Sequence, residues 1–322
     1  MNLPIQQLGA ADVADREQFK SAVLEGLAAR PRAIPARFLY DARGSTLFDA
    51  ICELPEYYLT RTETAILAGN AAEISRLAGP QCILIEFGSG SSVKSRLLLD
   101  AMSTLDAYVP IDISREHLDG TVARLRSDYP ALKVHAVCAD YMALDHLPDT
   151  INGHRRIGFF PGSTIGNLTP EEATSFLRRV RRLLGRDGAL ILGVDLKKDR
   201  RRLHDAYNDA AGVTAQFSLN LLRRMNRELD ATFDLAAFAH EAFYNPVESR
   251  IEIYLRSLQA QTVSVAGHRF TFEEGERIHT EYSYKFDDAS LAALAGSGGF
   301  AVERTWADPE GLFAVAWLKA RL

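Results

Sequence analysis

The chain has 322 residues, of which 47% are hydrophobic and 25% are charged, and its formal net charge is −5. This composition excludes an intrinsically disordered protein, and the length allows one or two compact cores. The acidic balance argues against a general attraction to nucleic acid. The N-terminus lacks a signal-peptide pattern and no apolar run could span a bilayer, so we expect a cytoplasmic protein without a membrane partner.

The cysteines and histidines indicate neither a disulfide framework nor a metal site. The three cysteines are odd in number and lie in or near apolar segments, so we expect buried free thiols at Cys52, Cys82 and Cys138. The eight histidines are scattered without the spacing of metal ligands. The sequence therefore predicts no metal centre.

The first 60 residues precede the predicted sheet. Residues 16–29 carry apolar side chains at helical spacing and predict a covering helix, which ends at a proline-rich break. Residues 36–59 are rich in aromatic side chains, including Tyr40 and Tyr57. A further helix is expected from Thr60 to Ala72, with a capping box at its start.

An apolar segment at 83–87 carries an acid, Glu86, near its end and is followed by two glycines, Gly88 and Gly90, and by a helical segment that starts at Val93. This order predicts a buried strand, a tight turn and a helix start, which together bring backbone amides to the mouth of a parallel sheet. Glycines at such a turn can also serve the turn geometry alone. The following strands therefore decide whether a ligand binds there.

The next two predicted strands also end in an acidic residue. Residues 108–112 end at Asp112, where a nucleotide-binding sheet places the carboxylate that holds ribose hydroxyls, and residues 134–140 end at Asp140. The carboxyl ends of parallel strands meet at one edge of a sheet. We therefore predict a nucleoside site formed by Gly88, Gly90, Asp112 and Asp140.

The residues at the helix start distinguish between possible nucleosides. A dinucleotide fingerprint has a third glycine where this chain has Val93. The acids and glycines look instead like the motif of S-adenosylmethionine-dependent methyltransferases, although its common form has one more glycine, where this chain has Ser92. S-adenosylmethionine has no phosphate, so it does not need the strong anion-binding site that a third glycine helps to form. We therefore expect this donor to bind.

A fourth strand at 157–161 leads into a loop that contains Asn167. Thr169 is expected to cap the next helix, with Pro170 at its first position. The loop then lies at the carboxyl end of the strand, where open α/β sheets bind ligands. The Asn167 amide could donate and accept hydrogen bonds there, although asparagine is also common in plain turns.

After a fifth strand at 189–195, the alternation of strands and helices stops. Residues 199–240 predict helices, while 250–256 and 261–265 alternate like antiparallel strands joined by a hairpin. The chain then returns to the sheet with a short helix and two closing strands. The closing strands are expected at 300–306 and 312–318. Because only a short turn joins them, they must be antiparallel.

The predicted fold class is α/β, with the Rossmann-like sheet of class I methyltransferases, helices on both faces and a second, smaller α+β substrate lobe. We expect the S-adenosylmethionine-binding domain at 61–198 and 287–322. The substrate-binding lobe is expected at 1–60 and 199–286.

With these segments placed, the sequence resembles the histidine Nα-methyltransferases of ergothioneine biosynthesis, which convert histidine to its trimethylammonium betaine, hercynine. The resemblance covers nearly the whole chain. The stretches that carry it are 38–45, 47–52, 54–63, 86–94, 162–170, 206–207, 212–217 and 280–286.

The resemblance implies roles for individual residues. The amine and carboxylate of the amino acid would be held by Tyr40, Asn167 and Tyr207, the first two as the catalytic pair. The imidazole would be surrounded by Tyr57, Glu281 and Ser283. The donor would be bound, together with Gly90 of the turn, by Gly88, Lys94, Asp112, Asp140 and Tyr141. One departure is Ile253, where we expect methionine in the better-known members.

The resemblance favours free L-histidine and its mono- and dimethylated forms as substrates of a monomeric enzyme. The nearest alternative is a methyltransferase that acts on tryptophan or tyrosine, because of Ile253. A nucleic-acid methyltransferase would use the basic runs at 178–182 and 197–202, which are more typical of solvated helix faces. A nicotinamide oxidoreductase is the most distant alternative.

Overall fold

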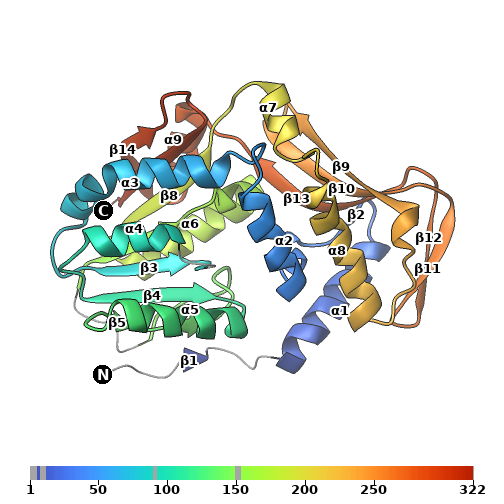
Figure 1. Cartoon of the computed structure of the whole chain (residues 1–322), viewed down its shortest axis with the longest axis horizontal. Helices are drawn as coiled ribbons and strands as arrows, with labels where there is room; N and C mark the ends of the chain where they lie inside the picture. The colour runs from blue at the N-terminus through green and yellow to red at the C-terminus, as the bar shows by residue number, and fades with distance from the viewer. Residues whose placement is uncertain (1–5, 8–11, 90–92, 149–153, 322) are drawn as a thin grey trace. The chain divides into compact units, whose positions relative to one another are not determined.

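The computed structural model describes residues 6–7, 12–89, 93–148 and 154–321. The chain forms two compact units, and each unit combines stretches that are far apart in the sequence (Figure 1). Unit 1 comprises Met1–Gly9, Leu59–Lys197 and Phe286–Leu322. Unit 2 comprises Ala10–Tyr58 and Lys198–Lys285.

The main sheet of unit 1 has the strand order β1-β6-β4-β3-β7-β8-β15-β14, and β5 also pairs with β4. The strands from β1 to β8 pair in parallel, whereas β15 is antiparallel to both of its neighbours. Their bounds are β1 Gln6–Gln7, β3 Ile83–Phe87, β4 Ala107–Asp112, β5 Lys133–Val134, β6 Val137–Cys138, β7 Arg156–Phe160, β8 Ala189–Asp195, β14 Phe300–Ala307 and β15 Phe313–Ala320. The predicted α/β sheet and its closing antiparallel pair are confirmed.

Apolar strands and helices form the core of unit 1. Every residue of β3 and β8 is buried, as expected for central strands of a sheet that is covered on both faces. Helix α3 packs against α4, and α6 packs against α9 (Figure 1). The helices of unit 1 are α3 Leu59–Ala78, α4 Val93–Ala101, α5 Arg115–Asp128, the 3-10 turn η2 Thr164–Asn167, α6 Pro170–Leu184 and α9 Asp288–Ser297.

Helix α6 begins as predicted. The Thr169 side chain accepts a hydrogen bond from the Glu172 amide at 3.2 Å, and the Glu172 carboxylate accepts one from the Thr169 amide at 2.9 Å. Two other predicted boundaries are wrong. Helix α3 continues to Ala78 rather than Ala72, and the segment 134–140 contains two short strands, β5 and β6, instead of one.

Unit 2 contains a four-stranded sheet in the order β2-β13-β10-β9 and a separate two-stranded sheet, β11-β12. Helix α8 packs against α2 and β9. The strands are β2 Arg32–Ala33, β9 Phe238–Asn245, β10 Arg250–Ser257, β11 Gln261–Val265, β12 His268–Phe272 and β13 Arg277–Tyr284. The helical elements are α1 Asp12–Ala28, η1 Ala36–Leu39, α2 Ala42–Cys52, α7 Arg200–Asp205, α8 Val213–Glu228 and η3 Leu235–Ala237.

The predicted hairpin between 250–256 and 261–265 is wrong. Strand β10 pairs with β13 and β9, whereas β11 pairs with β12. The prediction of helices throughout 199–240 is also wrong at its end, where β9 begins at Phe238. Alternating side chains identify a strand but not its partner, because pairing depends on packing between distant segments.

The cysteines are thiols rather than disulfides, as predicted. Cys82 and Cys138 are buried as expected, whereas the expected burial of Cys52 is wrong, because this residue is partly exposed. Within the described ranges, no helix is both long and apolar enough to cross a membrane. The same residues contain no group of histidine, cysteine and acidic side chains that could hold a metal ion.

Candidate active site

The glycine turn of unit 1 follows β3. Gly88 has a φ of 78°, and the amides of Gly88 and Ser89 donate to the Ile111 carbonyl at 2.9 and 3.1 Å. A Cβ atom at Gly88 would lie 3.5 Å from the Tyr141 ring and would require a backbone conformation that other residues rarely adopt. The predicted Gly90 lies outside the described residues, as does Ser92.

The two predicted acids lie beside this turn. Asp112 ends β4 and Asp140 follows β6, and the order β6-β4-β3 places these strand ends next to one another. Asp112 accepts a hydrogen bond from the Ser114 amide at 2.9 Å, and Asp140 accepts one from the Met142 amide at 2.8 Å. Each bond fixes one carboxylate oxygen.

Tyr141 links these residues. Burial raises the pKa of its phenol well above the ordinary value, and the negative charges of Asp140 and Asp112 raise this pKa further. Its ring packs against Phe160 at 5.6 Å and Phe176 at 5.8 Å. Gly88, Asp112, Asp140 and Tyr141 are therefore together at the carboxyl edge of the sheet.

Lys94 is held by a residue that the sequence analysis did not assign to the site. It forms an ion pair with Glu63, a fully buried acid on α3. The two Glu63 oxygens also accept hydrogen bonds from the Gly162 amide at 3.0 and 2.8 Å. A Cβ atom on Gly193 of β8 would lie only 2.0 Å from Glu63, so glycine leaves the room that this carboxylate occupies.

Asn167 ends the short helical turn η2. The turn begins after Ser163, whose φ is 57° and whose hydroxyl accepts a hydrogen bond from the Asp195 amide at 2.9 Å. Two residues after Asn167, the capping box of α6 fixes the chain again. The partly buried Asn167 thus lies on a backbone that is anchored on both sides.

In unit 2, five aromatic side chains form a cluster. The Tyr40 ring lies edge-on to Phe48 and Phe217, with centroid distances of 5.5 and 5.3 Å. Tyr57 lies edge-on to Phe48 at 6.2 Å and to Tyr207 at 6.3 Å. The structure thereby brings together the three predicted tyrosines, which come from three separate segments of the chain.

The predicted serine joins this cluster. The hydroxyls of Tyr207 and Ser283 lie 2.8 Å apart, and the buried Lys285 ammonium donates to both, at 2.9 and 2.7 Å. Neither Phe48, Phe217 nor Lys285 was assigned to the site from the sequence. All three nevertheless lie in the stretches that carry the family resemblance, which was the available signal.

A bulge in β13 sets the direction of the predicted acid. His279 pairs with Tyr254 and Glu281 pairs with Ile253, so Thr280 has no pairing partner on β10. Beyond this bulge, Glu281 and Ser283 share one face of the sheet with Ile253 and Ile251 opposite them. Ile253, the departure from the family pattern, is thus the direct cross-strand neighbour of Glu281.

The surroundings of Tyr57 shift its pKa. Burial raises this pKa well above its ordinary value, and Tyr207, Cys52, Tyr40 and Glu281 raise it further through their charged forms. Tyr57 is therefore a neutral hydrogen-bonding group at physiological pH. Unit 2 presents hydroxyls, aromatic faces, an acid and a buried ammonium in one place, a set suited to a zwitterionic amino acid.

The acid that precedes the glycines has a different role. Glu86 on β3 accepts hydrogen bonds from Ser95 at 2.6 Å and from the Tyr108 hydroxyl, and burial raises its pKa to about 8. Its side chain joins β3, β4 and α4 inside unit 1. It therefore supports the turn rather than presenting a carboxylate to a ligand.

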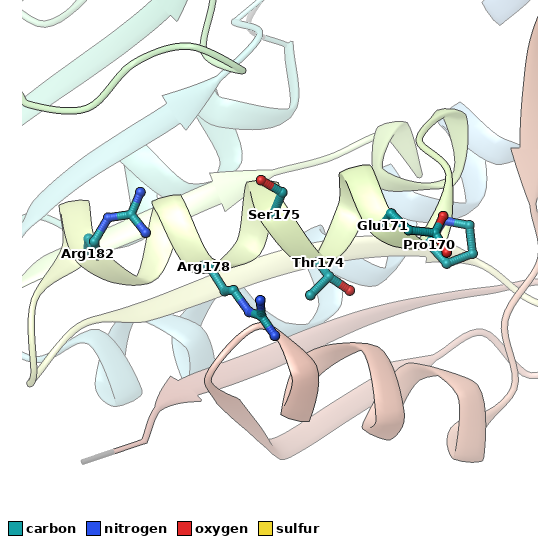
Figure 2. A pocket seen from close by; sticks show the side chains of 6 residues that line it. All are labelled: Pro170, Glu171, Thr174, Ser175, Arg178 and Arg182. Atoms are coloured by element: carbon teal, nitrogen blue, oxygen red, sulfur yellow. The ribbon is translucent and has the colours of Figure 1, made fainter.

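The basic runs make contacts within the protein. Figure 2 shows a surface hollow along α6, lined by Pro170, Glu171, Thr174, Ser175, Arg178 and Arg182. In this view Arg178 points toward α9, where it donates to the Ser297 carbonyl at 2.9 Å. Lys197 pairs with Asp287 at 2.7 Å. The hollow contains none of the predicted site residues, and these contacts weaken the nucleic-acid alternative.

Comparisons with known proteins show the family to which the chain belongs. Residues 19–320 match the family model described as "Histidine-specific methyltransferase, SAM-dependent". The Histidine N-alpha-methyltransferase of Mycolicibacterium smegmatis is 43% identical, over 98% of this chain and 99% of its own. Ergothioneine biosynthesis protein 1 of Neurospora crassa is 32% identical, over 86% of this chain and 32% of its own. A solved structure of a possible exported protein from Bordetella parapertussis is similar in fold, with 16% identity and a TM-score of 0.50, over 97% of this chain and 89% of its own.

Proposed function

The chain belongs to the family of S-adenosylmethionine-dependent, histidine-specific methyltransferases. On that premise we propose which of its residues bind the methyl donor and which bind the amino acid. The enzyme methylates the α-amino group of L-histidine and forms hercynine, an intermediate of ergothioneine biosynthesis. The observation that carries the assignment of residues is the cluster of Tyr40, Tyr57, Tyr207 and Ser283 in unit 2.

We propose that unit 1 binds S-adenosylmethionine. Two carboxylates at adjacent strand ends suit ribose and amino groups, and the glycine turn allows close approach of the backbone. Tyr141 adds a buried ring beside both acids. The donor would be held by Gly88, Gly90, Lys94, Asp112, Asp140 and Tyr141.

Unit 2 would supply residues for the amino acid. Tyr207 and Tyr40 would hold its carboxylate and amine, and the family resemblance adds Asn167 as a partner of the amine. The Glu281 carboxylate and the Ser283 hydroxyl could pair with the two imidazole nitrogens. A site built for these hydrogen bonds disfavours apolar side chains, because its polar groups would then be buried without partners.

S-adenosylmethionine would supply an electrophilic methyl group on its sulfonium. The amine would take this methyl group by an in-line displacement that releases S-adenosylhomocysteine. The protein's part is to hold an unprotonated amine with its lone pair toward that methyl group. A tyrosine hydroxyl and an asparagine amide can orient this lone pair without strong basicity. In each round the new nitrogen–carbon bond forms as the carbon–sulfur bond breaks.

The same groups allow repeated methylation. Histidine must lose a proton before the first transfer, and the mono- and dimethylated ammonium forms must each lose one before the next. We propose that these protons pass to water, since hydroxyls and an amide are weak bases. The final quaternary ammonium has no proton, and aromatic faces such as those of Tyr40 and Phe217 favour such a cation.

We propose that a single chain is the active species, because the residues assigned to the donor and to the amino acid all belong to it. Tryptophan and tyrosine remain second candidates as substrates only because Ile253 is the cross-strand neighbour of Glu281. These aromatic side chains would leave the Glu281 carboxylate without its imidazole partner.

Labelled S-adenosylmethionine offered with each of the twenty amino acids tests the function. We expect label in histidine alone, as mono-, di- and trimethylated products that mass spectrometry resolves. Replacing Glu281 by alanine should lower kcat/KM for histidine by about 100-fold, since one charged hydrogen bond to the imidazole is lost. Glu274→Ala, in the exposed turn before β13, is the matched control. Unchanged turnover in Glu281→Ala would remove the imidazole assignment.

A further inference from the structure

A histidine of unit 2 holds the backbone of one proposed site residue. Tyr207 lies in the irregular connection 206–212 between α7 and α8. Its carbonyl oxygen lies 2.9 Å from Nε2 of His240 on β9. The other ring nitrogen, Nδ1, lies 2.9 Å from the hydroxyl of Ser218, a residue of α8 that is 2% exposed. The imidazole thus links a strand, a helix and a site tyrosine.

The directions of both hydrogen bonds follow from their chemistry. A carbonyl oxygen can only accept, so Nε2 of His240 carries the proton that it donates to Tyr207. Burial lowers the pKa of His240, and this is the largest effect. The bond to Tyr207 and the charges of Asp209 and Glu241 act in the opposite direction. The ring is therefore neutral at physiological pH, and its Nδ1 accepts from the Ser218 hydroxyl.

The same connection has a second anchor on β9. The Asn208 amide donates to the Ala242 carbonyl at 3.1 Å and to the His204 carbonyl at 2.9 Å. This side chain already ties the connection to the strand. A backbone carbonyl needs one donor, which a flexible side chain could supply. An imidazole held at both nitrogens supplies instead a donor of fixed direction, and it does so at Tyr207.

We propose that His240 is a positioning residue, which together with Ser218 fixes the backbone of Tyr207 and hence the place of its hydroxyl in the amino-acid site. The inference rests on the proposed function, in which Tyr207 contacts the amino acid. The Tyr207 hydroxyl lies at the far end of its side chain, 2.8 Å from the Ser283 hydroxyl. An O–H···O hydrogen bond spans only about 2.5 to 3.0 Å, so a small shift of the backbone disturbs the contacts of this hydroxyl.

Two amides of different reach test the inference. The side-chain nitrogen of glutamine can take the place of Nε2, so His240→Gln can still donate to the Tyr207 carbonyl. Asparagine is one methylene shorter, so His240→Asn cannot. In His240→Asn, the KM for histidine should rise roughly 10-fold, which corresponds to one misplaced hydrogen bond. In His240→Gln, this KM should stay within about threefold of the wild-type value.

The KM for S-adenosylmethionine distinguishes positioning from a general loss of structure. The residues assigned to the donor belong to unit 1, whereas His240 and Tyr207 belong to unit 2. His240→Asn should therefore leave the KM for S-adenosylmethionine within about twofold of the wild-type value. A rise of both KM values by the same factor would contradict the inference.

A double variant tests whether His240 acts through Tyr207. Tyr207→Phe removes the hydroxyl and should by itself raise the KM for histidine about 10-fold. Adding His240→Asn to Tyr207→Phe should change this KM by less than about twofold, because no hydroxyl remains to be positioned. Independent structural roles would give additive effects, and additive effects would overturn the inference.

His268→Asn is the matched control, because His268 is an exposed histidine at the start of β12. It should keep the wild-type KM for both substrates. A His240→Asn protein that binds S-adenosylhomocysteine and keeps the wild-type KM for histidine would also overturn the inference. If Tyr207→Phe leaves the KM for histidine unchanged, the role of Tyr207 in the proposed function fails instead, so the two failures are distinguishable.

Ser218→Ala provides the test if His240→Asn does not fold. Without the hydroxyl, Nδ1 loses the donor that fixes the tautomer, and a proton on Nδ1 would remove the bond from Nε2 to Tyr207. The KM for histidine should rise about threefold, with the KM for S-adenosylmethionine unchanged. A wild-type KM for histidine in Ser218→Ala would contradict the inference.

Discussion

Glu86 shows how strongly the surroundings of one residue can change its chemistry. The side chain is 2% exposed and bonds to Ser95 and Tyr108, and burial raises its pKa to about 8. Near neutral pH this acid is largely protonated. Stability, rather than ligand binding, should therefore report on its protonation.

The raised pKa of Glu86 determines how the free energy of unfolding changes with pH. The pKa of about 8 in the folded protein exceeds the ordinary glutamate pKa of 4.5, so between these two values the folded state holds a proton that the unfolded state has lost. The contribution of Glu86 is complete below pH 4.5 and is lost as the pH rises through 8. The free energy of unfolding should fall by up to about 1.4 kcal/mol per pH unit across this window.

Glu86→Gln imitates the protonated acid and should remove this part of the pH dependence. Urea unfolding at about pH 5 and about pH 8 would measure it, as the difference between variant and wild type. Glu248→Gln, on an exposed turn of unit 2, serves as the control. Parallel pH dependence in Glu86→Gln and wild type would contradict the raised pKa.

At the scale of elements, helix α3 connects distant parts of unit 1 through its acids. Near its start, Glu63 holds both Lys94 of α4 and the Gly162 amide of the loop that leads to Asn167. Toward its other end, Glu73 accepts a hydrogen bond from Trp306 at 3.0 Å. The first acid supports the proposed donor site, and the second supports the sheet edge.

Glu63→Gln should therefore weaken donor binding. The neutral amide leaves the half-buried Lys94 ammonium without its ion-pair partner, so we expect affinity for S-adenosylhomocysteine to fall about 10-fold in calorimetry. Glu73→Gln, on the same helix, should leave this affinity within about twofold. If both variants bind the ligand as wild type does, Glu63 has no part in positioning Lys94.

Most strands of unit 1 could be predicted from the sequence, as could the antiparallel pairing of β14 with β15 across a short turn. The pairing of β10 and β11 in unit 2 could not be predicted. The predicted segment 189–195 coincides with β8, because an apolar run between turn residues identifies a buried strand. The partners of β10 and the bulge at Thr280 depend on packing between distant segments. The spacing of residues within one segment gives no information about its packing against distant segments.

The candidate site likewise has one part that the sequence predicted and one part that only the structure revealed. The glycine turn and the acids at 112 and 140 follow from strand ends, so residue patterns alone predicted them. The triangle of Tyr207, Ser283 and Lys285 joins residues 78 positions apart, and no spacing rule identifies such a contact. Only the family resemblance connected Tyr207 with Ser283, and Lys285 was found in the structure.

At the scale of the whole molecule, the two units should respond to different ligands. Hydrogen exchange with S-adenosylhomocysteine should slow in unit 1, at the turn after β3 and at the ends of β4 and β6. Addition of histidine should then slow exchange in unit 2, around Tyr57, Tyr207 and β13. NAD serves as the control ligand and should protect neither unit. Protection of β13 by S-adenosylhomocysteine alone would contradict this division.

The position of β15 has a consequence for synthesis of the protein. This strand, Phe313–Ala320, lies between β8 and β14, so β8 is without one neighbour until residues 313–320 have been translated. On the ribosome, a nascent chain that already contains both units' helices still exposes an unpaired strand. We expect such arrested chains to recruit chaperones until Ala320 has emerged from the exit tunnel.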